Sequence, residues 1–324
     1  MSSSVQQTNG YDIIGDIHGH ADALKALLQS MDYRETGGAW RHPERTAVFV
    51  GDFIDRGPKQ IETVDIVRRM IDAGSARAVM GNHEFNAIAW FLEDPENPGR
   101  HLRPHTDKNF KQHERFLAEV IGTPLHRELV DWFMSLPLWL ELDGIRIVHA
   151  CWHDPLIDYL RTRLTKGNVL TMELVAEASR KPQASEGARP DAPNMHNAIE
   201  IILKGLEIKL PDGHVFHDKD GHERRHVRTK WWNPDAATYK ATALNLTEQQ
   251  RAELPDTPIP DHARFWKGEG YPVLVGHYWF SGRPEVETDK VAVLDYSIAR
   301  GGKLVAYRWN GETSLDEELL HWVG

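Results

Sequence analysis

The chain has 324 residues, of which 40% are hydrophobic, and this suffices for one large domain or two small ones around an apolar core. Its formal charge of -10 argues against a nucleic-acid sleeve or an anionic membrane surface as the main partner. It does not exclude a nucleotide substrate, because bound metal ions supply positive charge of their own.

Cysteine content and hydropathy bear on location. Cys151 is the single cysteine, which excludes an internal disulfide and fits a reducing compartment. Residues 1–10 lack the apolar core of a signal peptide, and no apolar run approaches the roughly 20 residues that a membrane helix needs. We therefore expect a cytoplasmic protein without a membrane partner, whose first ten residues form a disordered tail.

The first element is an apolar segment, Tyr11–Ile14, which predicts a short buried strand. It leads into Gly15-Asp16-Ile17-His18-Gly19, and leucines then recur at helical spacing. Asp16 and His18 are two residues apart, so both side chains can point to one side of an extended loop. An aspartate with a neutral histidine suits Mn, Fe or Zn better than Ca or Mg.

The second unit repeats this layout. Ala47–Val50 predicts a buried strand, and Gly51-Asp52-Phe53-Ile54-Asp55-Arg56-Gly57 follows it. Pro58 then opens a helix with an apolar face. Two carboxylates this close are costly unless cations bind them, and an arginine beside them suits an anion. The loop therefore favours a metal site that also binds phosphate.

The third unit is a strand at Ala76–Met80, the loop Gly81-Asn82-His83-Glu84, and a helix to Leu92. Asn82 offers a neutral oxygen ligand, and the alternative is that it is the N-cap of the helix; it could do both if its side-chain oxygen is turned to the metal. His83 is the side chain here that can move a proton near neutral pH. Each loop alone fits ordinary turn and cap chemistry, but three copies in order make coincidence improbable.

Later strands add two more histidines. Asp143-Gly144 predicts a hairpin between 138–142 and 145–148, which ends at His149. Pro272–Val275 predicts a strand that ends near His277. We expect Val291–Leu294 to pair with Lys303–Trp309, and 313–322 to form a short amphipathic helix.

The segment Asp154–Gly270 lacks the strand–loop–helix rhythm and is interpreted as an insertion. It contains basic residues followed by Trp231 and Trp232. This patch could face an anionic substrate, with the tryptophans stacking on a base, or it could be a solvated hairpin with core tryptophans. The insertion lies between two strand-end histidines, so we expect it to form a cap over the site.

These motifs resemble those of the calcineurin-like metallophosphoesterases, in the phosphoprotein-phosphatase branch that also holds the bacterial diadenosine tetraphosphatases. Gly-Asp-Ile-His-Gly, Gly-Asp-Phe-Ile-Asp-Arg-Gly and Gly-Asn-His-Glu match that branch's motifs in order, over Tyr11–Trp152 and Tyr271–Trp309. The resemblance implies an α/β fold, a β-sandwich flanked by helices. Together with the insertion at 154–270, we expect a single domain over 11–324.

The resemblance also implies a set of metal ligands and catalytic residues. The implied ligands are Asp16 and His18 for a first ion, Asp52 between both ions, and Asn82, His149 and His277 for a second. Arg56 would hold a phosphate oxygen, and His83, oriented by Asp55, would protonate the leaving group. No clear motif places the second phosphate-binding arginine, for which the candidates are Arg228 and, behind it, Arg264 and Arg283.

We therefore expect a hydrolase of phosphoesters or phosphoanhydrides with two divalent metal ions, Mn and/or Fe, with Zn or Ni as alternatives. A hydroxide held between the cations would attack phosphorus in line. The substrate could be a phosphorylated small molecule, a nucleotide or a phosphopeptide, and a serine/threonine phosphoprotein phosphatase is one alternative. An alternative of a different class is a non-catalytic metal-binding scaffold.

Overall fold

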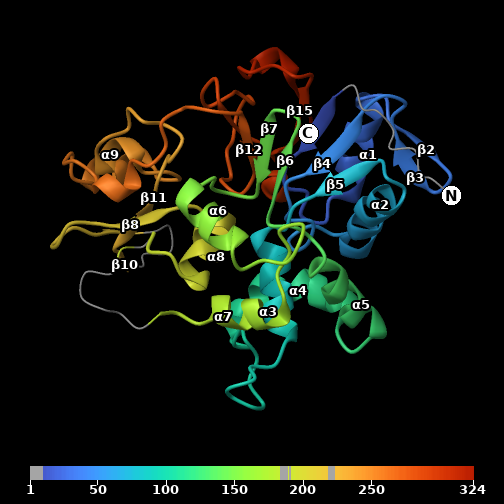
Figure 1. Ribbon diagram of the computed structural model, residues 1–324, viewed down its shortest axis with the longest axis horizontal. Helices are drawn as coiled ribbons and strands as arrows, with labels where there is room; N and C mark the ends of the chain where they lie inside the picture. Colours follow the sequence, from blue (N-terminus) through green and yellow to red (C-terminus); the bar gives the residue numbers. More distant parts are fainter. Residues whose placement is uncertain (1–9, 183–188, 190, 218–222) are drawn as a thin grey trace.

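The structure, a computed structural model, describes residues 10–182, 189, 191–217 and 223–324. Figure 1 shows strands of two sheets in the middle of the molecule, with α1 and α2 on one side and α9 with β8, β10 and β11 at the opposite end. The predicted N-terminal tail lies outside the described residues except for Gly10, which is buried.

The first sheet carries all three of the predicted strand–loop–helix units. Its strands are β1 (Tyr11–Ile14), β4 (Thr46–Phe49), β5 (Ala76–Ala78), β14 (Asp295–Tyr296), β15 (Lys303–Trp309) and β16 (Leu320–Val323). β1, β4 and β5 run parallel, so the loops that follow them leave from the same edge of the sheet. β15 pairs antiparallel with the other side of β1.

The second sheet contributes the late histidines. Its strands, in order, are β13 (Val291–Val293), β12 (Val273–Val275), β7 (Ile145–Val148) and β6 (Trp139–Leu142). β6 and β7 form the predicted hairpin, and β7 and β12 run parallel. Their carboxyl ends therefore also meet at one edge.

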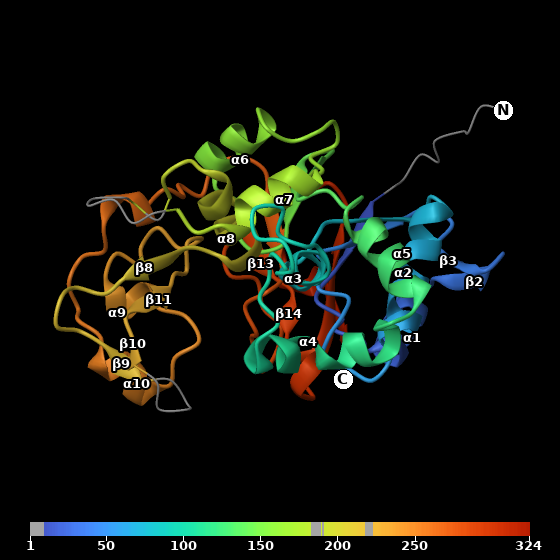
Figure 2. The same ribbon diagram turned by 90° about the horizontal axis from the view of Figure 1, so that it is seen from below.

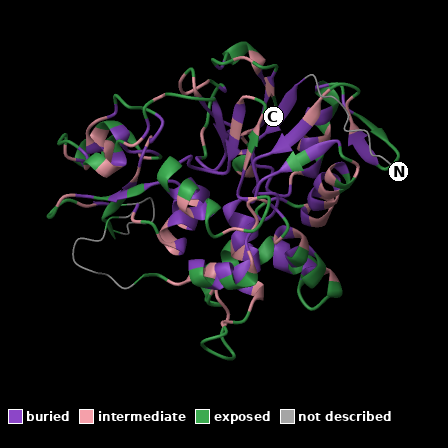
Figure 3. Ribbon diagram, viewed as in Figure 1, coloured by how far each residue is buried: buried purple, intermediate pink, exposed green. Residues whose placement is uncertain are grey.

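The two sheets pack face to face, which confirms the predicted β-sandwich. Ile13 of β1, Ile147 of β7 and Leu274 of β12 are fully buried in one apolar cluster between the sheets. The neighbouring Ile14 points to the other face of β1 and joins a second cluster, which includes Leu24 from a covering helix. Burial on both faces explains why these strands are continuous apolar runs (Figure 3).

Helices cover the outer faces of the sandwich. The helices before the insertion are α1 (Ala21–Ser30), α2 (Gln60–Asp72), α3 (Asn82–Phe91), α4 (Asp107–Val120) and α5 (Pro124–Phe133). α1 packs on α2 and the β15–β16 edge, whereas α2 packs on β5 and on β3 of the small hairpin β2 (Arg34–Thr36) and β3 (Ala39–Arg41). Figure 2 shows α1, α2 and α5 on the side away from the insertion, whereas α3 lies next to α7.

The insertion has two parts. Its elements are α6 (Asp154–Arg161), α7 (Met172–Ser179), α8 (Met195–Lys204), β8 (Glu207–Lys209), β9 (Phe216–His217), β10 (Glu223–Arg224), β11 (His226–Arg228), α9 (Tyr239–Thr242), α10 (Glu248–Glu253) and the 3₁₀ helix η1 (Asp261–Ala263). α7 packs on α3 and α8, and α8 packs on α6, so the helical part belongs to the body of the protein. The part from β8 onward forms a lobe at one end (Figure 1). The role of this lobe as a cap stays a prediction.

Two expectations near the C-terminus are wrong. β13 pairs with β12 in the second sheet, and only β14, after Leu294, returns to pair with β15. Residues 313–322 form no long helix: a 3₁₀ turn, η3 (Glu317–Leu319), leads into β16, which pairs antiparallel with β15. Leu320 is buried between the sheets and Trp322 is exposed, so backbone pairing at the sheet edge outweighs the local helical spacing.

Candidate metal centre

The predicted ligands converge at the edge where the strands of both sheets end. Each loop there bends sharply, and His18, Asp52, Asp55 and His277 all have positive φ, between 48° and 71°. Non-glycine residues adopt this conformation at a cost, and such strain concentrates at functional sites. Gly51, with φ +98°, is required by space as well, because a Cβ there would lie 2.4 Å from the backbone nitrogen of Gly81.

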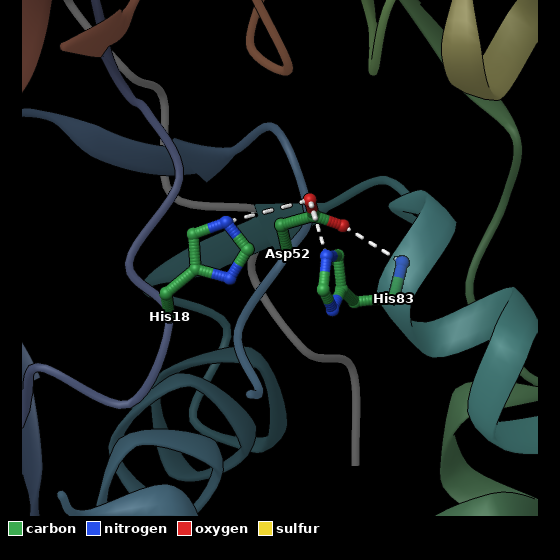
Figure 4. A group of neighbouring side chains, drawn as sticks. All are labelled: His18, Asp52 and His83. Carbon is green, nitrogen blue, oxygen red and sulfur yellow. Dashed lines mark hydrogen bonds and ion pairs between the residues drawn. The ribbon is translucent and has the colours of Figure 1, made fainter. Parts of the chain in front are cut away.

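Asp52 lies at the centre of the cluster. Its Oδ2 is 3.7 Å from His18 Nε2, 3.4 Å from His149 Nε2 and 3.9 Å from His83 Nε2. Its other oxygen accepts a hydrogen bond of 2.9 Å from the backbone N–H of His83. Figure 4 shows His18 and His83 facing this carboxylate from the two sides. Asp52 therefore belongs to both histidine groups that could hold an ion, one with His18 and His83 and one with His149 and His277.

Backbone carbonyls orient two of the histidines. The Nδ1 of His18 lies 2.9 Å from the carbonyl oxygen of Ile54, and the Nδ1 of His149 lies 2.7 Å from that of Val50. Donation from Nδ1 leaves the Nε2 lone pair of each ring aimed at the cluster, which is how proteins orient metal-binding histidines. Burial, with the nearby His83, lowers the pKa of His18 to about 3, so this ring is neutral at physiological pH.

Asn82 brings the second group together. Its side-chain oxygen lies 3.1 Å from His149 Nε2 and 2.6 Å from His277 Nδ1. Asn82 is the first residue of α3 and Gly81 is the cap, so the alternative interpretation of Asn82 as the helix cap is wrong. Its amide oxygen is instead turned to the two histidines, as a ligand requires.

Asp16 lies between the two strand-end loops. One of its oxygens accepts a 3.0 Å hydrogen bond from the backbone N–H of His277, and 4.0 Å separates it from His18 Nε2. Its Oδ1 is buried and has no hydrogen-bond partner among the described residues. A Cβ on Gly276 would lie 1.9 Å from that oxygen, so the strand end can approach Asp16 only because residue 276 is glycine.

The donor set fits divalent cations. Asp16, Asp52 and Asp295 are all buried within this cluster, and buried carboxylates require positive charge nearby. Burial and the neighbouring Asp295 raise the pKa of Asp16 well above its usual range. The buried Nε2 atoms of His18 and His277 have no hydrogen-bond partner among the residues that the structure describes. Carboxylate oxygens, an amide oxygen and imidazole nitrogens together suit transition metals.

The Nε2 atom of His83 faces the same cluster, and the Nδ1 atom of its ring contacts Asp55. Its Nδ1 is 2.5 Å from Asp55 Oδ2, so its Nε2 points to the metal side. Burial disfavours the imidazolium, yet the charges of Asp52 and Asp55 outweigh it and raise the pKa of His83 above its ordinary value. The ring can thus carry a proton next to the site. By distance alone His83 could also be a ligand, so its assignment as the acid stays a prediction.

His113, from α4, is a residue of the site that no sequence motif predicts. Its Nδ1 lies 2.8 Å from both oxygens of Asp55, so two histidines hold this buried carboxylate. Burial would raise the pKa of Asp55, but His113 and His83 lower it to about 2. His113 lies far along the chain from Asp55, and no motif near it signals the contact.

Glu84 is a second residue whose role was not predicted. This fully buried carboxylate accepts hydrogen bonds of 2.8 to 2.9 Å from the backbone N–H groups of Asp52, Phe53 and Gly81. It therefore ties the second loop to the start of α3. Its place directly after His83 in the third motif was a signal that could have identified it.

The candidate phosphate-binding arginines occupy different surroundings. Arg56 is exposed beside the cluster, with its guanidinium 4.5 Å from the centre of the Trp279 ring. Arg228 pairs with Glu207 at 3.0 Å, and its charge, after burial, is the next largest cause that lowers the pKa of His277. Arg283 lies against residues 314–318, away from the cluster, and Arg264 follows η1.

The tryptophans of the insertion are structural. Trp231 and Trp232 are 3% and 1% exposed, so neither can stack on a substrate base, and of the two alternatives the one with core tryptophans agrees with the structure. Trp231 donates to the carbonyl oxygen of Ala150 at 3.1 Å, and Trp232 packs edge-on against Tyr278. They anchor the lobe on residues adjacent to His149 and His277.

Comparison with known proteins indicates the same family as the sequence motifs. The model of the calcineurin-like phosphoesterase family matches residues 11–200. An asymmetrical bis(5'-nucleosyl)-tetraphosphatase of Bacillus velezensis is 35% identical over 43% of this chain and 55% of its own length. A symmetrical bis(5'-nucleosyl)-tetraphosphatase of Vibrio campbellii is 25% identical over 95% of this chain and 98% of its own.

The chain spans 55% and 65% of the length of the first two relatives that it matches. Among solved structures, a cold-active protein-tyrosine phosphatase of a psychrophilic Shewanella is 19% identical, with a TM-score of 0.48. The similarity covers 98% of this chain and 85% of that one. None of the described helices is both long and apolar enough to cross a membrane. Because the family model matches more than half of the chain, the protein belongs to the calcineurin-like phosphoesterase family.

Proposed function

We propose that the protein hydrolyses phosphoesters or phosphoanhydrides with two divalent metal ions held by Asp16, His18, Asp52, Asn82, His149 and His277. The observation that carries the proposal is the position of Asp52, which both histidine groups share. One carboxylate placed between two sets of nitrogen ligands is what a pair of neighbouring cations needs. When bound, such a pair activates water and stabilises charge on the phosphate oxygens.

The residues around the cluster have roles that complement the metals. Arg56 would hold an oxygen of the phosphate, and Arg228 is the candidate for a second such contact. His83 would give its Nε2 proton to the departing oxygen while Asp55 holds the ring. The charge of Asp55 favours the protonated ring before transfer.

The choice of metals and substrate is also part of the proposal. The mixed oxygen and nitrogen set favours Mn and/or Fe, with Zn or Ni as alternatives. The names of the two bacterial relatives support a nucleotide with several phosphates as substrate, in preference to a phosphopeptide. A cytoplasmic location stays a prediction.

The test is metal content together with turnover. We expect about two ions per chain after loading with Mn²⁺, and hydrolysis of an aryl phosphate that requires them. Asp52→Asn should lose both ions and nearly all turnover, because one change weakens both ligand groups. Two bound ions without hydrolysis of an aryl phosphate, a dinucleoside polyphosphate or a phosphopeptide would favour the scaffold alternative. At most one ion in the wild-type chain would contradict the proposed centre.

A further inference from the structure

Next to the candidate metal centre, the guanidinium groups of two arginines lie against the ring of one exposed tryptophan. Trp279 is 36% exposed, and the guanidinium groups of Arg56 and Arg300 lie 4.5 Å and 4.2 Å from the centre of its ring. Arg56 comes from the second motif loop, whereas Arg300 ends the 3₁₀ helix η2 (Ile298–Arg300) that follows β14. No sequence motif gives a role to Trp279 or Arg300.

The backbone around this tryptophan is fixed by a buried carboxylate. Asp295 accepts hydrogen bonds from the backbone N–H groups of Trp279 at 2.9 Å and Ser297 at 3.0 Å. Both of these residues have positive φ, 53° and 59°, which costs energy and persists only where the surroundings enforce it. The ring is therefore held in place on strained loops beside the metal centre, as expected of a functional group.

The charges on the ring are not neutralised within the protein. Neither Arg56 nor Arg300 forms an ion pair with an acidic side chain among the described residues, although the chain has a net charge of -10. By contrast, Arg228 nearby is paired with Glu207. Two like charges beside one ring repel each other, and a bound anion that contacts both guanidinium groups would offset that repulsion. Because two guanidinium groups already lie against the ring, it is better suited to hold these arginine side chains in position than to stack on a base.

The location of the two arginines identifies the anion. A small pocket is lined by His18, Arg56, Trp279, Asp295, Ser297, Ala299 and Arg300. It thus includes a predicted metal ligand, His18, and the arginine predicted to hold the reacting phosphate, Arg56. An anion held by Arg300 while Arg56 holds the reacting phosphate must be close to that phosphate. Neighbouring phosphates in a polyphosphate chain meet this condition because they share a bridging oxygen.

We propose that Trp279, Arg56 and Arg300 form a subsite for the phosphate next to the one that is hydrolysed. This inference rests on the proposed hydrolase function and assigns residues that would distinguish a polyphosphate from a phosphomonoester. In the reaction, water adds to the phosphorus at the metal centre and the bond to the bridging oxygen breaks. The bridging oxygen leaves with the neighbouring phosphate, whose charge Arg300 partly neutralises.

The test compares probes with one phosphate and with several on the metal-loaded full chain. The variants are Arg300→Ala, Arg300→Lys and, as a matched control, Arg34→Ala, an exposed arginine of the separate β2–β3 hairpin. Binding of orthophosphate and of a methylene-bridged ATP analogue is measured by calorimetry. Turnover is measured with p-nitrophenyl phosphate and diadenosine tetraphosphate.

We expect Arg300→Ala to weaken binding of the ATP analogue about tenfold, the effect of one charge-assisted hydrogen bond. Orthophosphate binding should weaken by a smaller factor, and the preference for diadenosine tetraphosphate over the aryl phosphate should fall about tenfold in kcat/KM. Arg300→Lys should restore part of the loss because it keeps the charge. The control should behave as wild type.

The outcomes separate this inference from the proposed function. Equal effects of Arg300→Ala on both probes, no effect on either, or an equal loss on a phosphopeptide substrate would overturn the subsite. Wild-type protein that binds the analogue but hydrolyses no phosphate compound would refute the hydrolase function. In that case the binding measurements alone would decide whether Arg300 reads a second phosphate.

Discussion

His83 and His113 both contact Asp55, and this arrangement allows a quantitative prediction about how His113 affects catalysis. His113→Phe removes one of the two side-chain donors to this carboxylate and keeps a ring of similar size in the aromatic cluster around Phe116. Among the described residues, Asp55 then keeps only His83 as a partner for its carboxylate. The carboxylate gains freedom to turn, and His83 loses the fixed partner that aims its Nε2 at the site.

The magnitude follows from the pKa of Asp55. A change from the ordinary pKa of 3.8 to about 2 corresponds to about 2 kcal/mol of folding stability. Because the folded-state pKa is depressed, this stability is fully present above the unfolded-state pKa and is lost as pH falls through about 2. After burial, which acts in the opposite direction, His113 is the largest cause of the shift. We therefore expect His113→Phe to lose on the order of 1–2 kcal/mol at pH 7.

Rate measurements distinguish positioning from a merely structural role. If His83 donates a proton, the loss in kcat should be about tenfold for an alkyl phosphate, and smaller for an aryl phosphate that leaves without help. His113→Asn should restore part of the rate, because its amide can place a donor near the position of the lost Nδ1. His126→Phe is the control, since His126 is buried in the same aromatic cluster without a carboxylate partner among the described residues.

Either of two results would refute this role of His113. One is a loss of rate that is equal for good and poor leaving groups, which would indicate a general structural defect. The other is wild-type activity and stability in His113→Phe, which would mean that His83 alone fixes Asp55.

Two further changes test the neighbouring residues. His83→Asn should keep both metal ions and lose roughly 10²–10⁴-fold in kcat on a poor leaving group, with less loss on an aryl phosphate. Loss of one ion on metal analysis would instead identify His83 as a ligand. Glu84→Gln should destabilise the metal-free chain by about 1–3 kcal/mol in urea denaturation, because an amide NH₂ then faces buried N–H groups. An unchanged unfolding midpoint would show that the three backbone contacts of Glu84 contribute little.

The parts of the site that the sequence could predict are those in which a short segment carries both the strand and the ligand. A buried strand fixes where its last residue lies, so the sequence alone suffices to place Asp16, Asp52 and Asn82 at one edge of a sheet. His149 and His277 follow by the same reasoning in a second sheet. The β-sandwich then brings the two edges together.

The parts that could not be predicted depend on contacts between distant segments. The sequence of α4 is mostly polar, and only the packing of that helix turns the ring of His113 toward Asp55. The errors at the C-terminus have the same origin, since β16 exists only because the edge of β15 is open to it. Helical spacing in residues 313–322 is a local preference, and sheet pairing is a long-range one.

Trp231, Trp232 and Trp279 illustrate why residue type alone does not decide which aromatic groups meet a substrate. The two adjacent tryptophans attracted attention because basic residues precede them, yet both are buried and anchor the lobe. Trp279 follows the predicted ligand His277 by two residues and has no basic neighbour in sequence. The two arginines beside its ring, Arg56 and Arg300, come from other loops of the chain. A cluster of like charges beside an active site is a property of the fold. Arg300 forms no ion pair among the described residues, and its position became visible only because β14 and β15 of the first sheet place η2 beside the second motif loop. The motifs could therefore be recognised in the sequence, whereas the proposed subsite depends on loops that only the fold brings together.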